Sequence, residues 1–171
     1  MDADEIAREV VQPGRWAYRR IIAAFGKRVC NSDGTIDRVL LRRMIFEDPL
    51  LRRRLNAATH PSIVLEIIRQ IAFHRLVRWR RLVVLDAPLL FETRLNYLCR
   101  YVVVVSCSED LQTQRLMARD HVSKEVAHKS IHAQMPLTAK MRLADCVIVN
   151  DSSLELLAER VGEVYAVLLT L

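Results

Sequence analysis

An apolar run that ends in an acidic residue and a proline is the feature of this chain that most constrains its fold. The run Arg81-Leu82-Val83-Val84-Leu85 leads directly into Asp86-Ala87-Pro88-Leu89-Leu90-Phe91-Glu92. Buried strands of parallel α/β sheets are nearly continuous apolar runs, and such sheets bind ligands beyond the carboxyl ends of their strands. The segment therefore predicts a parallel sheet that presents Asp86 at its carboxyl edge, followed by a helix that begins near Pro88.

Helical and strand patterns alternate along the chain. Short β-branched or apolar runs predict strands at 82–85, 101–107 and 146–150. Apolar spacing and capping residues predict helices over 4–11, 15–25, a segment capped by Asp37, 49–58, 61–79, 109–119, 123–132, 136–144 and 152–169. This βαβ alternation predicts an α/β fold, and the block 15–79 reads as a helical subdomain inserted into it.

Basic residues concentrate in the first half of the chain. Residues 1–81 carry 17 Arg and Lys against 9 Asp and Glu, whereas residues 82–171 carry 9 against 11. Because arginine suits phosphate recognition, this imbalance favours an anionic, phosphate-bearing ligand. Any single cluster is explained as well by ordinary charged residues on solvated helix faces. The clusters Arg52–Arg54 and Arg78–Arg81 could also belong to a basic surface that binds RNA.

Other features narrow the class of protein. No apolar run approaches the ~20 residues of a membrane span, and the acidic start shows neither a secretory signal nor a transit peptide. The four cysteines are far apart without CxxC spacing, which favours buried thiols over a zinc site, and no metal-ligand set is predicted.

The phosphate-binding loop of P-loop enzymes is missing from these residues. That loop needs the pattern GxxxxGK[ST], whose amides and lysine hold phosphates. The chain has glycines only at 14, 26, 34 and 162, and its single Gly-Lys pair, Gly26-Lys27, is preceded by Ile21 where the first glycine belongs and followed by Arg28.

The start of the chain and the segment around Asp86 together resemble the dephospho-CoA kinase family. Asp2-Ala3-Asp4-Glu5-Ile6-Ala7-Arg8 matches its DADxxAR motif, which in the family follows a Gly-rich phosphate loop. The resemblance implies a three-layer P-loop-kinase-like parallel sheet with an inserted helical subdomain, here without its first strand and phosphate loop. It further implies a single domain over 1–171, with the insert at about 15–79, sheet core at about 80–108 and 145–171, and a lid at about 109–144.

The resemblance also implies roles at the start of the chain. Asp4 matches the family aspartate that faces the substrate ribose and accepts the proton of its 3′-hydroxyl; alone, it would read as a helix N-cap. Asp2 is the first aspartate of the motif, and Arg8, one turn after Asp4, would hold a substrate phosphate or simply pair with Asp4. His60 would lie near the acceptor site, although Thr59-His60-Pro61 is also what a helix start requires.

Further site residues follow from the segment after the strand at 82–85. Asp86 would touch a magnesium-bound water, or else cap the helix predicted near Pro88. Leu89 would be part of the core or of the substrate wall. Glu92 would form a salt bridge or contact the substrate.

The lid and nucleotide residues come from the second half. Arg115 and Arg119, four apart on a predicted helix, match lid arginines that stabilise the transferring phosphate. Arg142 would reach the nucleotide phosphates, and Asn150 would lie in the turn near the adenine. Taken singly, each of these arginines also fits an ordinary solvated helix charge.

The implied activity is Mg²⁺-dependent phosphorylation of the 3′-hydroxyl of dephospho-CoA by ATP, in the cytoplasm or in association with mitochondria. Without the phosphate loop we expect this activity to be impaired and ATP binding to be weak or lost. Two alternatives stay open at this stage: a non-catalytic relative that binds dephospho-CoA or a protein partner, and another P-loop acceptor kinase. No nucleic-acid partner is expected.

Overall fold

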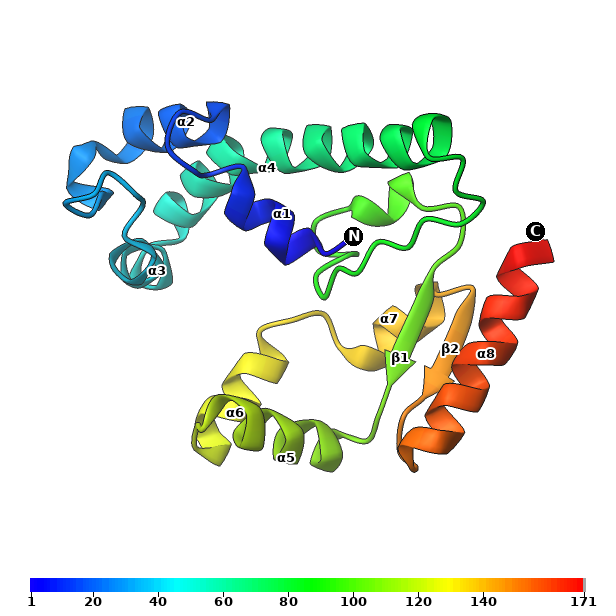
Figure 1. The fold of residues 1–171 in the computed structure, drawn as a ribbon. Coiled ribbons are helices and arrows are strands. Elements are labelled where there is room, and N and C mark those ends of the chain that lie inside the picture. The colour runs from blue at the N-terminus through cyan, green and yellow to red at the C-terminus, as the bar shows by residue number, and fades with distance from the viewer. Residues whose placement is uncertain (171) are drawn as a thin grey trace. The chain divides into compact units, whose positions relative to one another are not determined.

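The computed structural model describes residues 1–170, which form two compact units that divide after Ala87. The first unit contains α1 (Ala3–Glu9), α2 (Trp16–Phe25), η1 (Lys27–Val29), α3 (Arg38–Glu47), α4 (Pro49–Ala72) and the π-helical turn η2 (Phe73–Val77) (Figure 1). The second contains η3 (Leu95–Leu98), β1 (Val103–Ser106), α5 (Glu109–Asp120), α6 (Lys124–His132), α7 (Leu137–Leu143), β2 (Cys146–Val149) and α8 (Leu154–Thr170). Among these helices, none has the length and apolar character needed to cross a membrane.

The core of the first unit lies between α2, α3 and α4. Ile21 and Phe25 of α2 are buried together with Val29, Leu41 of α3 and Ala58 of α4. Aspartates begin the two later helices: the Asp37 carboxylate accepts from Leu40 N–H, and Asp48 accepts from Leu50 N–H. The expected apolar faces and the expected cap at Asp37 therefore build this bundle, together with a cap at Asp48 that was not predicted from the sequence.

The longest helix departs from the sequence prediction at its centre. The sequence predicted two helices separated before Pro61, but α4 runs unbroken past this residue. Proline removes one backbone donor from a helix, and the neighbouring Thr59 hydroxyl donates to Leu55 O at 3.0 Å. Ala58 and Ile67, buried on either side, anchor the helix across the missing hydrogen bond. Tertiary packing here outweighs the local preference to stop.

The segment predicted as a strand at 82–85 is extended but is not a regular strand. The Met1 ammonium donates to Val84 O at 2.9 Å, and Asp86 N–H donates to Met1 O at 2.8 Å. Ala3 N–H donates to Asp86 O at 2.9 Å, which completes a parallel bridge between Asp2 and Asp86. Among residues 1–170 the segment makes this one bridge, which lies at Asp86 just after the predicted range, so the prediction of a strand at 82–85 is wrong.

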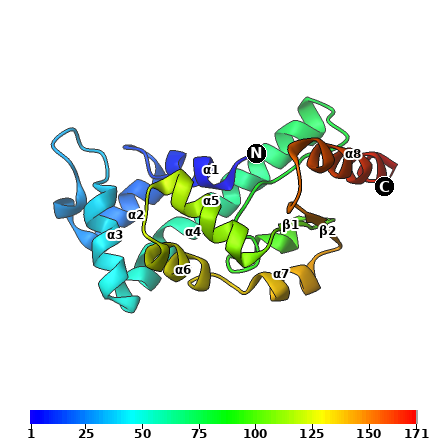
Figure 2. The ribbon, with the colours of Figure 1, turned by 90° about the horizontal axis from the view of Figure 1, so that it is seen from below.

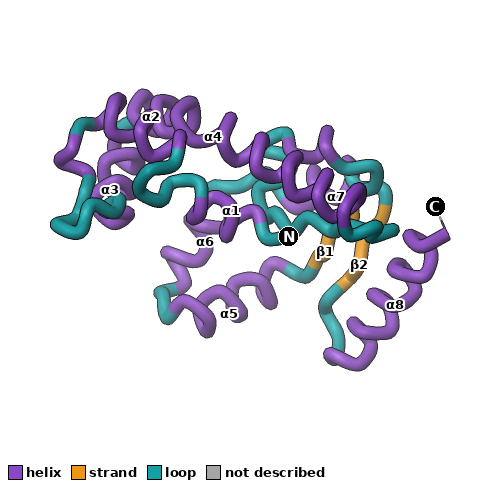
Figure 3. The backbone as a smooth tube through the Cα atoms, turned by 45° about the horizontal axis from the view of Figure 1, so that its top comes forward, coloured by secondary structure: helices purple, strands orange, loops and turns teal. Residues whose placement is uncertain are grey.

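The second unit contains the regular sheet. Strands β1 and β2 pair in parallel, with Val103 opposite Cys146 and Ser106 opposite Val149, and Figure 3 shows both strands in this unit. The Asp145 carboxylate accepts from Val102 N–H at 2.7 Å and so fixes the start of the pair. The predicted βαβ alternation and parallel sheet are confirmed.

Helices complete the second unit around these strands. Helix α7 packs on β1, α8 packs on β2, and α5 packs against α6 as a helical hairpin (Figure 2). The helix predicted near Pro88 is absent, because residues 88–94 form successive turns that end at Arg94, whose φ is 60°. Buried Leu95 then anchors η3. The four cysteines are free and half-buried rather than buried.

Candidate functional site

The aspartate that caps the first helix is Asp2, not Asp4. One carboxylate oxygen of Asp2 accepts from Asp4 N–H at 2.7 Å and from Glu5 N–H at 3.1 Å. The interpretation of Asp4 as an N-cap is therefore wrong. Asp4 is exposed in the first turn of α1, and within residues 1–170 its carboxylate has neither a hydrogen-bond nor an ion-pair partner. This carboxylate is available to a ligand.

Asp86 lies beside the start of α1 through the parallel bridge to Asp2. Its backbone is bonded on both sides, whereas its side chain is exposed and makes no hydrogen bond or ion pair within the described part of the chain. Since no helix begins near Pro88, the alternative role of Asp86 as a helix cap is also wrong. The first unit thus brings three acidic residues, Asp2, Asp4 and Asp86, to the end of one short pairing.

Arg8 follows Asp4 by one helical turn and is exposed. Its carbonyl accepts from the Arg38 guanidinium at 3.3 Å, which ties the end of α1 to the start of α3. Between described residues the guanidinium of Arg8 forms no ion pair, including with Asp4. Its positive charge on the same helix as Asp4 suits an anionic ligand.

His60 does not stand at a helix start. It is half-buried near the middle of α4, directly before Pro61. The helix start expected at Thr59-His60-Pro61 is therefore wrong, because Asp48 caps this helix and Thr59 donates back to Leu55 O. Helix α4 packs on α1, and His60 lies on this same helix.

In the second unit, Glu92 forms a salt bridge rather than lying free. Its carboxylate accepts from Met135 N–H at 2.9 Å and from Lys140 Nζ at 3.0 Å. Lys140 also donates to Pro88 O at 3.0 Å and Gln134 Oε1 at 3.1 Å. Burial raises the pKa of Glu92, whereas hydrogen bonds from Met135 N–H and the Lys140 ammonium lower it. The lowering effects together are larger, so the pKa lies below its ordinary value. This cluster fastens the turn at 88–92, with Leu89 exposed on it, to the start of α7.

The two arginines of α5 have different partners. Arg115 donates to Asn150 O at 3.0 Å and so joins α5 to the end of β2. Arg119 forms a two-bond ion pair with Asp120 at 2.7 and 3.0 Å. This hydrogen-bonded pair raises the pKa of Arg119 and lowers that of Asp120. The structure therefore brings Arg115 and Asn150 together and leaves Arg119 on the exposed end of α5 with its neighbour.

A cavity of about 540 Å³ opens at the carboxyl ends of β1 and β2. Ser106 and Asp151 line it from the strand ends, Glu109 and His132 from the helical hairpin, and Lys140 from α7. None of the residues predicted for the site in this unit lines it, including Arg142, which is exposed in the last turn of α7.

Sequence reasoning missed Lys140 and the residues at the base of the hairpin. Lys140 carries one sequence signal, as one of only four lysines in the chain. Glu109 and His132 lie 23 positions apart, and their proximity depends on the way the hairpin folds back.

The second unit has a parallel strand pair with a cavity at its carboxyl ends, which is the arrangement in which α/β proteins bind their ligands. The chain is therefore of the broad class of ligand-binding parallel α/β proteins. The sequence model described as dephospho-CoA kinase matches residues 1–155. This chain belongs to the dephospho-CoA kinase family.

Individual relatives agree with this assignment. The chain is 46% identical over 156 residues to a dephospho-CoA kinase domain-containing protein of Danio rerio, covering 91% of this chain and 68% of that protein. It is 45% identical to a dephospho-CoA kinase of Oceanobacillus iheyensis, covering 91% and 77%. An uncharacterized protein of Schizosaccharomyces pombe is 40% identical, with 96% and 70% covered.

Solved structures show the same fold. The crystal structure of TT1252 from Thermus thermophilus has a TM-score of 0.77 at 26% identity, covering 97% of this chain and 82% of that one. A dephospho-CoA kinase from Campylobacter jejuni has a TM-score of 0.70 at 24% identity, with the same coverage. The α/β fold with an open parallel sheet is thus confirmed, whereas the single-domain boundaries, the missing first strand and the cytoplasmic location stay predictions.

Proposed function

We propose that this chain acts in the transfer of the ATP γ-phosphoryl group to the 3′-hydroxyl of dephospho-CoA, giving CoA and ADP. The observation that carries the proposal is that Asp2 caps α1 whereas the carboxylate of Asp4 is left exposed. Because Asp2 satisfies the free amides of α1, the Asp4 carboxylate is left exposed and unpaired among the described residues at the start of a helix beside Asp86. A general base needs such an available carboxylate.

In the proposed reaction Asp4 accepts the proton of the acceptor hydroxyl. The 3′-oxygen then forms a bond to the γ-phosphorus, while the bond between this phosphorus and the oxygen shared with the β-phosphate breaks and ADP leaves. Arg8, on the same helix face, would hold an acceptor phosphate, and His60 would contribute to the acceptor site from α4. Arg115, Arg119 and Arg142 would stabilise negative charge on the phosphates.

The lid arginines differ in how ready they are for this role. Arg115 is already fixed to Asn150 O, whereas Arg119 must exchange its Asp120 partner for a phosphate. Both residues of this pair are substantially exposed, and exposed ion pairs contribute little to stability. Arg119 therefore loses little free energy when it gives up its ion pair with Asp120 to bind a phosphate.

In the first unit, Asp86 is the residue we propose for contact with a magnesium-bound water. Carboxylate oxygens suit Mg²⁺, and the exposed Asp86 side chain fits the role of holding a metal-bound water. When bound, Mg²⁺ would neutralise charge on the transferring phosphates.

The missing GxxxxGK[ST] pattern bears on ATP rather than on the acceptor. These 171 residues supply neither the amide cradle nor the lysine of that loop. We expect the 171-residue chain by itself to bind ATP weakly and to turn over slowly. Binding of dephospho-CoA needs only the acceptor residues of the first unit, the exposed Arg8 among them, so a non-catalytic protein that binds dephospho-CoA is the second candidate function.

One experiment separates these functions. The phosphate-loop segment of the Danio rerio relative, joined ahead of Asp2, gives an extended chain, and CoA formation from dephospho-CoA and ATP is measured by chromatography. We expect the extended chain to form CoA, and Asp4→Asn in it to lower kcat about 10²-fold or more with little change in KM. Glu5→Gln, which alters a neighbouring exposed acid, serves as the matched control and should retain activity.

The possible results discriminate clearly. An extended chain that folds and binds dephospho-CoA but forms no CoA would support the non-catalytic function. An Asp4→Asn variant with normal turnover would exclude Asp4 as the base while leaving family membership intact.

A further inference from the structure

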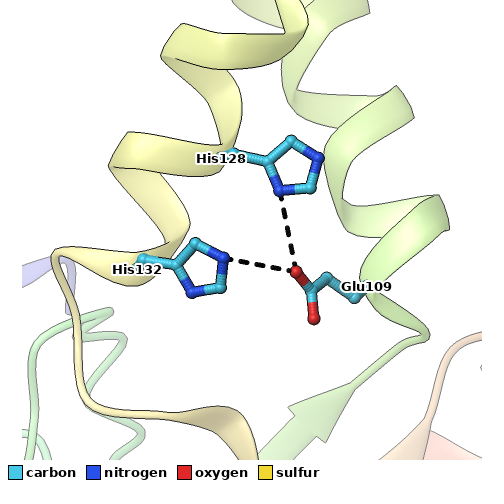
Figure 4. A group of neighbouring side chains, drawn as sticks. All are labelled: Glu109, His128 and His132. Atoms are coloured by element: carbon cyan, nitrogen blue, oxygen red, sulfur yellow. Dashed lines mark ion pairs between the residues drawn. The ribbon is translucent and has the colours of Figure 1, made fainter.

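Three side chains that carry metal-binding atoms converge at the base of the α5–α6 hairpin. Glu109 is the first residue of α5, and His128 and His132 lie one turn apart near the end of α6. Figure 4 shows both imidazole rings directed toward the Glu109 carboxylate. The Glu109 Oε1 atom lies 3.7 Å from His128 Nδ1 and 3.5 Å from His132 Nε2, and the three atoms lie within 4.8 Å of one another.

These separations are close to those around a tetrahedral metal ion. Zinc binds imidazole nitrogen and carboxylate oxygen at about 2.0–2.2 Å, so two of its ligand atoms lie about 3.3–3.6 Å apart. The two distances to Glu109 already match this range to within about 0.1–0.2 Å. The two histidine nitrogens lie within 4.8 Å of each other, and small rotations of the exposed His132 ring and the half-buried His128 ring bring them into this range.

The backbone around the three residues holds them in register. Ala127, fully buried on α6, fixes the rotation of that helix, and the Ser123 hydroxyl accepts from Val126 N–H at its start. The two histidines then share one helix face, as residues four apart do. Since α5 packs against α6, Glu109 faces them from the neighbouring helix.

The ligands are also accessible. The side chains of Glu109, His128 and His132 are 57%, 36% and 67% exposed. Glu109 and His132 line the 540 Å³ cavity at the strand ends. An ion bound here would therefore have three protein ligands and a fourth position open to water or to an anion.

We propose that Glu109, His128 and His132 form a binding site for one divalent transition-metal ion of the zinc class. Two histidines and one carboxylate with an open position are a donor set that zinc accepts. The ion links the first turn of α5 to the last turn of α6 and so holds these two ends of the hairpin together. The site uses none of the residues proposed for phosphoryl transfer.

The competing explanation is a plain surface ion pair between Glu109 and protonated histidines. Helix ends favour this distribution of charge, with an acid in the first turn and basic groups in the last. Such a pair needs no third partner, whereas here both rings approach the same oxygen atom. The two explanations differ in whether a metal binds.

The test is calorimetric titration of the 171-residue chain with ZnCl₂, together with absorption spectra of the chain with Co²⁺. We expect one zinc ion per chain, and each of Glu109→Gln, His128→Ala and His132→Ala to weaken binding by at least about tenfold, since even loss of outer partners of metal ligands costs 10–100-fold. Two matched controls should bind as the parent does. Glu155→Gln alters an acid in the first turn of α8, and His74→Ala removes a histidine from η2.

The Co²⁺ spectrum guards against binding by cysteine, because Cys107 lines the same cavity. Bands of a nitrogen and oxygen environment support the site, and intense thiolate charge-transfer bands overturn it. Equal zinc affinity in parent and ligand variants, or no binding to the folded parent chain, would also overturn the proposal. Circular dichroism of each variant verifies that lost binding does not reflect lost structure.

Discussion

Asp2 and Asp86 pair through their backbones in parallel, with Ala3 N–H donating to Asp86 O at 2.9 Å and Asp86 N–H donating to Met1 O at 2.8 Å. The pairing joins the first residues of the chain to a segment more than eighty positions away. It sets the start of α1 beside the carboxyl end of the extended segment, where parallel α/β proteins place their polar site residues. The position of Asp4 therefore depends on Asp2 twice, through this bridge and through the helix cap.

The first prediction concerns that cap. Asp2→Ala should lower the free energy of unfolding by about 1 kcal/mol, because loss of an N-cap side chain costs about 0.5–2 kcal/mol. Asp2→Ser should restore most of the loss, since serine also caps helices. Urea denaturation followed by circular dichroism measures the difference, and equal destabilisation by alanine and serine would show that the Asp2 side chain has another role.

The second prediction concerns the Glu92 and Lys140 cluster. Lys140→Met keeps most of the side chain's length but removes its ammonium. In the described structure the Glu92 carboxylate then keeps Met135 N–H as its donor from a distant part of the chain. We expect a loss of about 1–2 kcal/mol in stability, as for a partly buried polar group deprived of its partner.

Lys129→Met, which removes an exposed lysine from α6, is the matched control and should change stability by less than about 0.5 kcal/mol. The two variants are compared by thermal unfolding under the same conditions. Similar behaviour of the two would mean that the 3.0 Å contact contributes no more than an ordinary surface charge.

Local patterns in the sequence were sufficient for most helices and for the parallel sheet. Helices α5, α6 and α8 fall within a few residues of their predicted ranges because their apolar spacing and polar flanks are strong. Asp37 and Pro49 correctly marked the starts of α3 and α4. The strand at 101–107 was also found, although only Val103–Ser106 pairs.

The errors arise where distant contacts decide the outcome. Pro61 predicted a helix start, but burial of Ala58 and Ile67 keeps α4 continuous across it. Two aspartates two positions apart are equally good caps by sequence, and only the path of the backbone shows that Asp2 takes the role. The contact of Glu109 with two histidines of α6 depends on helix packing that no local pattern encodes.

The third prediction concerns pH. The guanidinium of Arg69 is the main cause that lowers the pKa of Glu66 from 4.5 to about 2, with a smaller contribution from the Gln70 amide. Because the folded pKa lies below the ordinary value, the ionised Glu66 stabilises the fold above pH 4.5. This contribution is lost as the pH falls toward 2.

Glu66→Gln should therefore be less stable than the parent at pH 6, and the difference should shrink steadily below pH 4.5. Adding Arg69→Met to Glu66→Gln should cost little more, because the two side chains act as one pair. Urea denaturation at pH 6, 4 and 3 measures these differences. A parent-to-variant gap that stays constant across this range would contradict a lowered pKa for Glu66.

The last prediction concerns ligands of the 171-residue chain. If the acceptor site is formed by the first unit, this chain should bind dephospho-CoA weakly, whereas Mg²⁺-ATP should bind far more weakly or not at all, because the amides and lysine of a phosphate loop are missing from these residues. Arg8→Ala should lower the affinity for dephospho-CoA about tenfold, since a charge-assisted hydrogen bond contributes about 1.5–3 kcal/mol and part of it is screened at an exposed site. Arg53→Ala, an exposed arginine on α4, is the control that should leave the affinity unchanged. Calorimetry with both ligands tests the prediction, and tight binding of Mg²⁺-ATP to the unextended chain would show that other residues hold the phosphates.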